Sequence, residues 1–350
     1  MKYARLVVAL ALIGLLAGLG PHVLPEYWVR VLIVLGINII LVSSLGLSNG
    51  FTGVFSLGHP GFVALGAYVS GILTLELTKK GAYLPDLPGF LAGVQLPFLP
   101  ATLIAGVFCA LVAVVIGIPL MRLSGNYVSV ATLGFLVIVN VVLVNAEQFT
   151  RGSRTFTGIP PYTDLGWVAG WAVVTLLVLS RVAYSPLGRA MRATRDDPIA
   201  AQAVGIHILP ARLMAFALGA FFAGVGGALY GHYLVSFSPA TFYVAMLVQQ
   251  LTMLVLGGQA SLTGAVVGVS AITLLSEVLR NLERGFSLGS LQVPAVFGAS
   301  QIALGFIFIL VMVYRPQGLL GDRELPLVTG GRVAKGAGPV YKDTVGGGRT

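Results

Sequence analysis

The sequence predicts an all-α fold: a polytopic transmembrane bundle of about ten helices. Three observations lead to this expectation: 57% of the 350 residues are hydrophobic, only 9% are charged, and the apolar residues form long runs. A soluble domain normally carries about 25% charged residues. A chain this poor in charge cannot cover a water-facing surface, so lipid must solvate most of it.

Apolar runs long enough to cross a bilayer mark the expected spans. They cover residues 4–19, 28–48, 57–78, 98–121, 127–146, 164–182, 210–232, 243–258, 262–280 and 297–314. Lys2 and Arg5 before the first run imitate a signal peptide, but no clear small-residue cleavage site follows, so we expect a retained helix.

Small residues inside the apolar runs favour close helix packing. Gly227/Gly231 and Gly264/Gly268 have the small-xxx-small spacing, which we interpret as packing within one bundle rather than a dimer seam. The single cysteine, Cys109, forms neither a disulfide nor a metal-ligand pair, so we expect a packing residue and no metal site.

Lys and Arg residues predict the orientation. With a cytoplasmic N-terminus and ten spans, fourteen of them lie inside and seven outside, so we expect both termini in the cytoplasm. The same rule accounts for the net charge of +9 without nucleic acid. Residues 326–350 hold seven glycines and no apolar pattern, which predicts a flexible cytoplasmic tail after a membrane domain of residues 1–325.

One polar loop, residues 183–209, differs from the rest of the chain. Ser185 followed by Pro186 predicts a capped helix over about 186–195. Asp197 followed by Pro198 predicts a second short helix that stops at Gly205. Such a loop suits docking against a soluble partner, but a solvated charged loop beside lipid headgroups explains the residues equally well.

Five segments together resemble the LivM-type permeases of branched-chain amino acid ABC transporters. The polar loop reads GRAMRATRDDPIAAQAVGI over 188–206 and resembles the family's ATPase-docking loop. The others, in the expected order, are GVFSLGHPGFVALGAY (53–68), FTRGSRTFTGIP (149–160), LGGQASLTG (256–264) and YRPQGLLG (314–321). One departure is visible: the family often has Gly-Leu-Gly-Ser where this chain has Gly258-Gln-Ala-Ser261.

The resemblance implies a type II ABC importer permease in a bacterial or archaeal cell (inner) membrane. Its implied partners are a related, LivH-like permease, two ABC ATPase subunits and an extracytoplasmic substrate-binding protein. The implied substrates are leucine, isoleucine and valine, with urea or short amides as the alternative in the same architecture. The docking residues that we infer are Gly188, Arg189, Arg192, Arg195, Asp196, Asp197, Ala200, Ala201 and Gly205.

The residue chemistry agrees with a pump that is driven by separate ATPases. No Gly-Lys-Ser or Gly-Lys-Thr phosphate loop is present, so we expect ATP and Mg²⁺ to bind partner subunits and no cofactor to bind this chain. An ion-coupled carrier needs ionisable residues within its spans, and the span interiors are nearly free of charge. Glu76 and Glu277 lie near the expected external ends, where we expect them to reach water.

A pathway for a zwitterion needs a polar, uncharged lining. The candidates on spans are Asn38, Ser43, Asn126, Thr132, Asn140, Gln249 and Gln250. In lipid an unpaired amide is costly, so each must face protein or water, and for any single one we favour a bridge between helices. The adjacent Gln249 and Gln250 cannot share one helix face.

Two glycine-rich loops share a Gly-x-x-Ser-Leu core at Gly53–Leu57 and Gly258–Leu262, a hint of an internal repeat. Each predicts either a broken helix beside a cavity or a tight interhelical turn. The pathway candidates within them are Gly53, Ser56, His59, Gly258 and Ser261. For His59 we favour a packed, hydrogen-bonded ring over a pH-sensitive group.

Two other classes of protein compete with the importer. An intramembrane enzyme needs a nucleophile–base pair or metal ligands, and no Gly-x-Ser-x-Gly or His-Glu-x-x-His occurs. A passive channel uses similar glycine-rich helices, and the loop at 188–206 is the main argument against it. Five charged residues are expected on the external side of the membrane, where they would either form salt bridges with the binding protein or form a solvated rim. They are Arg151, Arg154, Arg280, Glu283 and Arg284.

Overall fold

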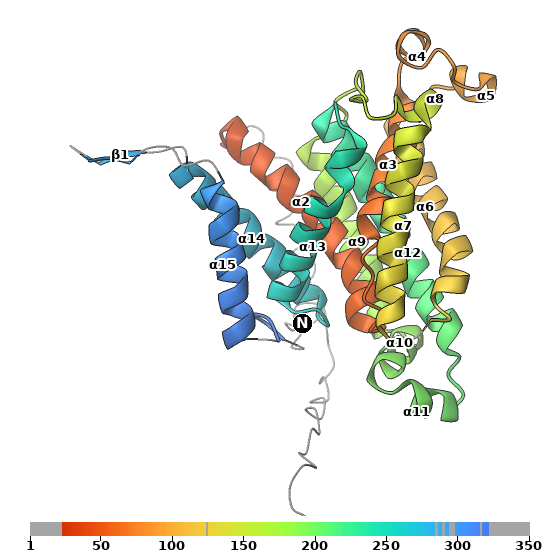
Figure 1. Ribbon diagram of the computed structural model, residues 1–350, viewed down its shortest axis with the longest axis vertical. Helices are drawn as coiled ribbons and strands as arrows, with labels where there is room; N and C mark the ends of the chain where they lie inside the picture. The colour runs from red at the N-terminus through yellow and green to blue at the C-terminus, as the bar shows by residue number, and fades with distance from the viewer. Residues whose placement is uncertain are drawn as a thin grey trace, which may run out of the picture.

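The structure, a computed structural model, describes residues 23–123, 125–283, 286–288, 291–293, 298–315 and 317–321 (Figure 1). Its helices are α2 (Glu26–Gly46), the π-helix η1 (Leu47–Phe51), α3 (His59–Thr74), α4 (Leu77–Tyr83), α5 (Gly89–Ala92), α6 (Phe98–Leu120), α7 (Asn126–Asn145), α8 (Glu147–Thr150), α9 (Leu165–Tyr184), α10 (Pro186–Asp196), α11 (Pro198–Ala203), α12 (Ile208–Leu234), the 3₁₀ helix η2 (Pro239–Phe242), α13 (Val244–Gly257), α14 (Leu262–Glu283) and α15 (Ala299–Tyr314).

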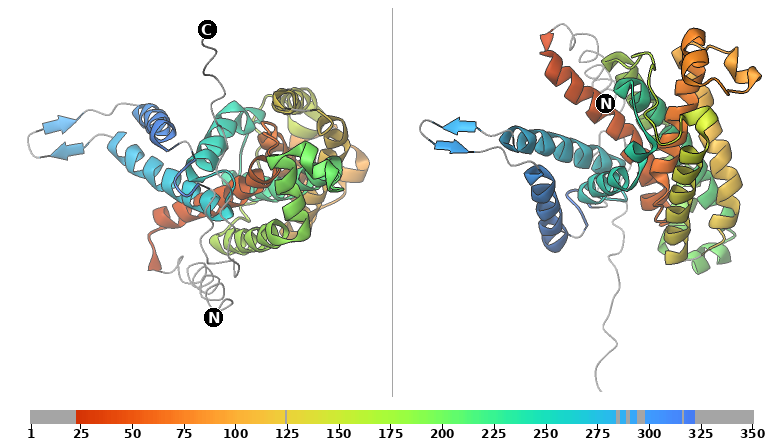
Figure 2. Two further views of the ribbon diagram at one scale, coloured as in Figure 1. Left: turned by 90° about the horizontal axis from the view of Figure 1, so that it is seen from below. Right: turned by 45° about the horizontal axis from the view of Figure 1, so that its top comes forward.

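One short hairpin interrupts the helical fold. Strands β1 (Phe286–Leu288) and β2 (Leu291–Val293) pair antiparallel and project from the side of the bundle (Figure 2). The expected helical bundle is therefore confirmed, with this ribbon as a small addition that the apolar pattern did not predict.

Within the described residues, seven helical segments are long and apolar enough to cross a membrane. They are Glu26–Phe51, Phe98–Leu120, Asn126–Asn145, Leu165–Tyr184, Ile208–Leu234, Pro239–Gly257 and Leu262–Arg280, and each meets one expected apolar run. The expected spans at 57–78 and 297–314 fit less well. The chain bends by 119° between α3 and α4, and the apolar part of α15, Ile302–Val311, is short for a crossing.

Two predictions for the ends of the chain concern residues outside the described ranges: the first span at 4–19 and the tail at 326–350. The helices that are described alternate in direction, so their connections gather at two opposite ends (Figure 1). We call these the α10 end, with α10, α11 and the turn between α13 and α14, and the α4 end, with α4, α5 and α8.

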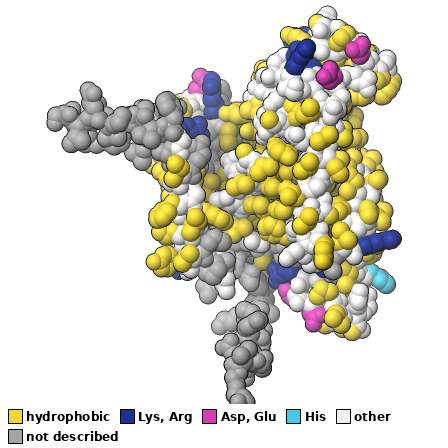
Figure 3. Space-filling view, viewed as in Figure 1, with side chains coloured by type: hydrophobic (Ala, Val, Ile, Leu, Met, Phe, Trp, Pro, Cys, Tyr) yellow, Lys and Arg dark blue, Asp and Glu magenta, His cyan; other side chains and the backbone are white. Residues whose placement is uncertain are grey.

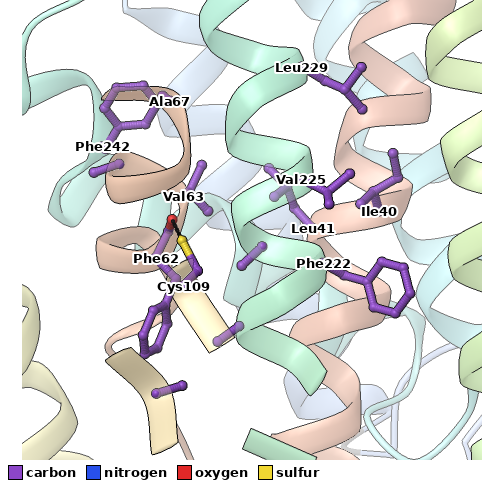
Figure 4. Packing of buried hydrophobic residues seen from close by; sticks show 14 of the residues in the cluster. Ile40, Leu41, Phe62, Val63, Ala67, Cys109, Phe222, Val225, Leu229 and Phe242 are labelled. Atoms are coloured by element: carbon purple, nitrogen blue, oxygen red, sulfur yellow. Dashed lines mark hydrogen bonds between the residues drawn. The ribbon is translucent and has the colours of Figure 1, made fainter. Parts of the chain in front are cut away.

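Helix α12 lies at the centre of the bundle and packs against α2, α3 and α6. Gly224 meets Gly66, and Gly227 meets Val63, so closely that a Cβ on either α12 glycine would crowd its neighbours. Cys109 is fully buried and its Sγ donates to the carbonyl oxygen of Phe62 at 3.3 Å (Figure 4). Close packing within one chain, the interpretation given to the paired glycines and the cysteine, is thus confirmed for Gly227 and Cys109.

Apolar side chains cover the belt between the two ends, whereas charged side chains gather at the ends themselves (Figure 3). Helices α6, α7 and α15 expose large apolar residues such as Val115, Val130 and Phe306, each at least 66% accessible. Surfaces of this kind face lipid or another apolar helix, because exposed apolar area on this scale is not stable in water.

Candidate functional site

The polar loop at the α10 end forms two capped helices. Ser185 Oγ accepts a hydrogen bond from the backbone N–H of Gly188 at 3.3 Å, and Pro186 occupies the first turn of α10. Asp197 Oδ1 accepts from the N–H groups of Ile199 and Ala200 at 2.9 and 3.0 Å and caps α11. The expected helices and their caps are confirmed.

The end of α11 depends on a glycine. Gly205 has φ +84°, a left-handed conformation that side chains with a Cβ rarely adopt, and its N–H donates to the carbonyl of Gln202 at 3.0 Å. The next N–H, that of Ile206, donates to the Ala201 carbonyl at 3.0 Å. The chain therefore leaves α11 sharply and enters α12, as the position of this glycine predicted.

The docking candidates divide into exposed and enclosed positions. Arg189, Asp196, Asp197, Ala200 and Gly205 are exposed, whereas Gly188 and Ala201 are buried in the chain itself. A buried Ala201 cannot pack into a partner's groove without movement, so the position of this residue corrects the expectation. The loop also exposes Ile199 and Val204, at 80% and 76%, and neither was among the predicted docking residues. Their apolar side chains within an otherwise polar loop could have indicated them as docking residues.

Two of the predicted docking arginines point back toward the bundle. Arg192 donates to the Ala183 carbonyl at 2.6 Å, and its guanidinium lies 5.4 Å from the centre of the Phe51 ring. Arg195 donates to the Gly50 carbonyl at 2.9 Å and pairs with Asp196 at 3.0 Å. These contacts attach α10 to the π-helix at the end of α2.

The first glycine-rich loop is a break between helices. After η1, residues 52–58 run without helical structure to the start of α3. Asn49 Oδ1 accepts from the Ser56 N–H at 2.9 Å, and Thr132 Oγ1 on α7 accepts from the Leu57 N–H at 2.9 Å. Gly53 lies against the side chain of Arg195, so α10 covers this segment.

The second glycine-rich loop is a tight turn between α13 and α14. Ser261 Oγ accepts from the Gly264 N–H at 3.0 Å, which caps the first turn of α14. Residues near the C-terminal end of the described chain close the turn, because the N–H of Leu319 donates to the Leu256 carbonyl at 2.8 Å and Gly258 lies against Gly321. The tight-turn alternative is thus found for the second loop, whereas the first loop is a longer non-helical connection between η1 and α3.

A cavity of about 330 Å³ lies at the α4 end between α2, α13, α14 and the end of α12. It is lined by Tyr27, Arg30, Val31, Val34, Asn38, Tyr233, Gln249, Thr273, Ser276, Glu277 and Arg280. Asn38 and Gln249 are the two pathway candidates in this lining. Gln250 is 1% exposed on the other side of α13, so the two glutamines occupy different faces, as expected.

The remaining pathway candidates mostly join helices. His59 is buried, and its Nε2 lies 3.1 Å from both Ser44 Oγ and the Leu41 carbonyl oxygen, the packed arrangement favoured for it. Asn140 Nδ2 donates to the Pro239 carbonyl at 3.3 Å. Ser43 is fully buried, whereas Asn126 is exposed at the start of α7, at the α10 end.

A second buried histidine was not predicted to matter. His232 Nδ1 lies 2.8 Å from the Pro160 carbonyl oxygen, and its Nε2 lies 3.1 Å from Ser70 Oγ and 3.2 Å from Thr74 Oγ1. The ring also packs against Phe98. This network joins α3 and α12 to the loop before α9, and no spacing in the sequence could have revealed it because its members are far apart along the chain.

A second, larger cavity of about 800 Å³ lies at the α10 end, between the loop after α6 and the junction of α11 with α12. Arg122, His207 and Arg212 are its basic lining residues, and Pro198, Gln202 and Gly205 come from the polar loop. Among the described residues, no group of three or more His, Cys, Asp or Glu side chains is arranged to hold a metal ion.

Within the described residues, long apolar helices with a capped polar hairpin at one end are the architecture of a multi-pass membrane protein. The sequence profile of the family described as "Branched-chain amino acid transport system / permease component" matches residues 27–314, and the chain belongs to this family. The match covers almost all of the described bundle.

Curated relatives of two kinds are similar to the chain. The LivM permease protein of the high-affinity branched-chain amino acid transport system of Escherichia coli K12 is 28% identical over 334 residues, covering 86% of this chain and 71% of the relative. A probable LivM of Methanocaldococcus jannaschii is 22% identical, covering 85% and 94%. The LivH permease protein of Salmonella typhimurium is 25% identical, covering 80% and 89%. No solved structure gave a significant match.

Proposed function

We propose that this chain is one permease subunit of an ATP-driven importer and carries branched-chain amino acids across the cell (inner) membrane of a bacterium or archaeon. The observation that carries the proposal is the capped α10–α11 hairpin at one end of a membrane bundle, in a chain of this permease family. The substrate class comes from the names of the relatives.

The partners follow from the same comparisons and surfaces. Similarity to both LivM and LivH proteins supports pairing with a second, related permease subunit of LivH type. The ATPase subunits would dock at the α10 end, where Arg189, Ile199 and Val204 are exposed. ATP and Mg²⁺ would bind those subunits, and the substrate-binding protein would approach the α4 end. In this arrangement the α10 end and both termini are cytoplasmic.

The contacts of α10 suggest how ATP hydrolysis would reach the membrane. Arg195 holds the Gly50 carbonyl, and Arg192 lies beside Phe51, so a movement of α10 would displace η1 and the loop that follows it. Coupling of this kind requires an element with two arrangements. A π-helix that leads into a non-helical segment is a reasonable candidate, because such irregular segments often occur at functional sites.

The proposal predicts ATP-dependent uptake of labelled leucine. The chain would be co-expressed with candidate permease and ATPase partners, reconstituted in vesicles and supplied with binding protein. We expect uptake that requires ATP and that isoleucine and valine inhibit. A complex that hydrolyses ATP and imports urea or a short amide instead of leucine would overturn the substrate class. If no ATPase binds, the docking function of α10 and α11 fails and a passive channel becomes the better hypothesis.

A further inference from the structure

The cavity at the α4 end combines charges of both signs, whereas the helix surfaces around it are apolar. Its lining includes two guanidinium groups, of Arg30 and Arg280, and one carboxylate, of Glu277. The first residue belongs to α2 and the other two to α14. Charges are costly near a membrane core and usually mark a functional site when they line a water-filled cavity.

Glu277 is the carboxylate of this cavity and is 6% exposed. It accepts a hydrogen bond from the Tyr27 hydroxyl and forms an ion pair with Arg280 at 3.3 Å. A carboxylate has about four lone-pair positions, so two such contacts leave acceptor capacity for another donor. A ligand ammonium group would use that capacity and would be partly shielded from water.

The two arginines are more accessible than the carboxylate. The side chain of Arg280 is 57% exposed, and that of Arg30 is 65% exposed and pairs with Glu26 at 2.5 Å. A guanidinium has five N–H donors, and one carboxylate contact each leaves several of them available. Guanidinium groups hold a ligand carboxylate through paired, charge-assisted hydrogen bonds.

The rest of the lining suits an aliphatic body with a polar head. Val31 and Val34 lie one turn apart on α2 and form an apolar part of the wall. Asn38, Gln249 and Thr273 add uncharged polar groups, and the buried Thr273 Oγ1 has no hydrogen-bond partner among the described residues. The volume of about 330 Å³ is roughly ten times the ~30 Å³ that one water occupies in the liquid, which is room for one small solute.

We propose that this cavity binds the zwitterionic form of an aliphatic amino acid, with Arg30 and Arg280 on its carboxylate and Glu277 on its ammonium group. Val31 and Val34 contact the aliphatic side chain. The inference rests on the proposed transport function and deepens it, since it gives a reason why the pathway accepts a zwitterion rather than neutral urea or an amide. A neutral solute would form no ion pair with Arg30, Arg280 or Glu277.

The test measures leucine binding to the purified complex with its partners in nanodiscs, without ATP and without binding protein. We expect Glu277→Gln to weaken binding about tenfold or more, because it removes a charge-assisted hydrogen bond. Glu76→Gln is the matched control. Glu76 pairs with Lys79 at 3.1 Å with the same three-residue spacing, also toward the α4 end, but it does not line the cavity. This control should bind leucine like the unmodified complex.

Ligand analogues separate recognition from a structural effect. The compound 4-methyl-2-hydroxypentanoate is leucine with a hydroxyl in place of the ammonium group. The unmodified complex should prefer leucine, and Glu277→Gln should abolish that preference. Arg280→Gln, a change at an exposed side chain, should instead abolish the preference for leucine over leucinamide, which lacks the carboxylate. Preferences that survive in both variants would overturn the proposal, whatever their effect on complex stability.

Uptake with ATP and binding protein distinguishes failure of the proposed binding site from failure of the proposed transport function. If the unmodified complex imports leucine and Glu277→Gln imports it equally well, the transport function stands and this binding site is wrong. If the unmodified complex imports no amino acid, the proposed function fails, and the binding site fails with it.

Discussion

The two Gly-x-x-Ser-Leu segments have the same pattern and different structures. Gly53–Leu57 lies in a non-helical stretch between η1 and α3, whereas Gly258–Leu262 forms a tight turn that leads directly into α14. Both lie at the α10 end, where η1, the π-helix just before the first segment, touches the second segment, since a Cβ on Gly50 would overlap the carbonyl oxygen of Gln259. The pattern therefore marks the place where a helix starts, and the neighbours of each segment decide the backbone.

Those neighbours also suggest different roles. The first segment is held by α10 through Arg195, so it is connected to the helices proposed to receive the ATPases. The second is closed by residues 317–321 through backbone hydrogen bonds from Leu319 and Leu320. We infer that the first segment transmits movement and that the second anchors α13 and α14. The three predictions below test this comparison.

The largest expected effect is that of Gly50→Ala, which probes the contact between η1 and the second segment. The new Cβ would overlap the backbone of Gln259, and no side-chain rotation relieves a clash with backbone. We expect a loss of more than about 3 kcal/mol in the free energy of unfolding, at the upper end for overpacking. Thermal unfolding in detergent, followed by size-exclusion chromatography, measures it.

Gly134→Ala is the matched control for this substitution. Gly134 lies inside α7, where a Cβ would meet nothing within 4 Å, so alanine should stabilise the helix by up to about 1 kcal/mol. Equal stability of Gly50→Ala and the unmodified protein would show that η1 and the second segment are not in contact.

The next effect concerns the attachment of α10. Arg195→Ala removes the hydrogen bond to the Gly50 carbonyl, and we expect transport to fall about tenfold while ATP hydrolysis and complex assembly persist. Arg189 lies on the same helix but is exposed, so Arg189→Ala should weaken assembly with the ATPases instead. ATPase activity and uptake would be measured on the same vesicles. If Arg195→Ala loses assembly in the same way, Arg195 is a docking residue and not an internal connection.

The sequence predicted local features well and long-range ones poorly. The ends of α10 and α11 were predictable because Ser185, Pro186, Asp197 and Pro198 act within a few residues of themselves. Whether a polar side chain lines a cavity or is buried between helices depends instead on which helices pack together. Gln249 and Gln250 were expected on different faces, but only the packing of α13 on α14 decides which of them meets the cavity.

Glu277 shows the same limit. Its position near the end of a span was predicted, and we expected it to reach water there. The structure places it in a nearly enclosed position, because Tyr27 from the start of α2 lies against it. These two residues are 250 positions apart, so no local pattern could have joined them. The direction of α10's arginines was unpredictable for the same reason, since Gly50 and Phe51 belong to a different helix.

The smallest expected effect is the difference in stability between alanine substitutions at the two serines of the shared pattern. Ser261 Oγ caps α14 through the Gly264 N–H, so Ser261→Ala should reduce the free energy of unfolding by about 1 kcal/mol. Ser56 Oγ is buried without a hydrogen-bond partner among the described residues, so Ser56→Ala removes an unsatisfied polar group and should be neutral or slightly stabilising. Parallel unfolding curves in one detergent would resolve the difference. If both substitutions lower the stability equally, the Ser56 hydroxyl has a hydrogen-bond partner, such as a bound water, and the two serines of the shared pattern are equivalent in their contribution to stability.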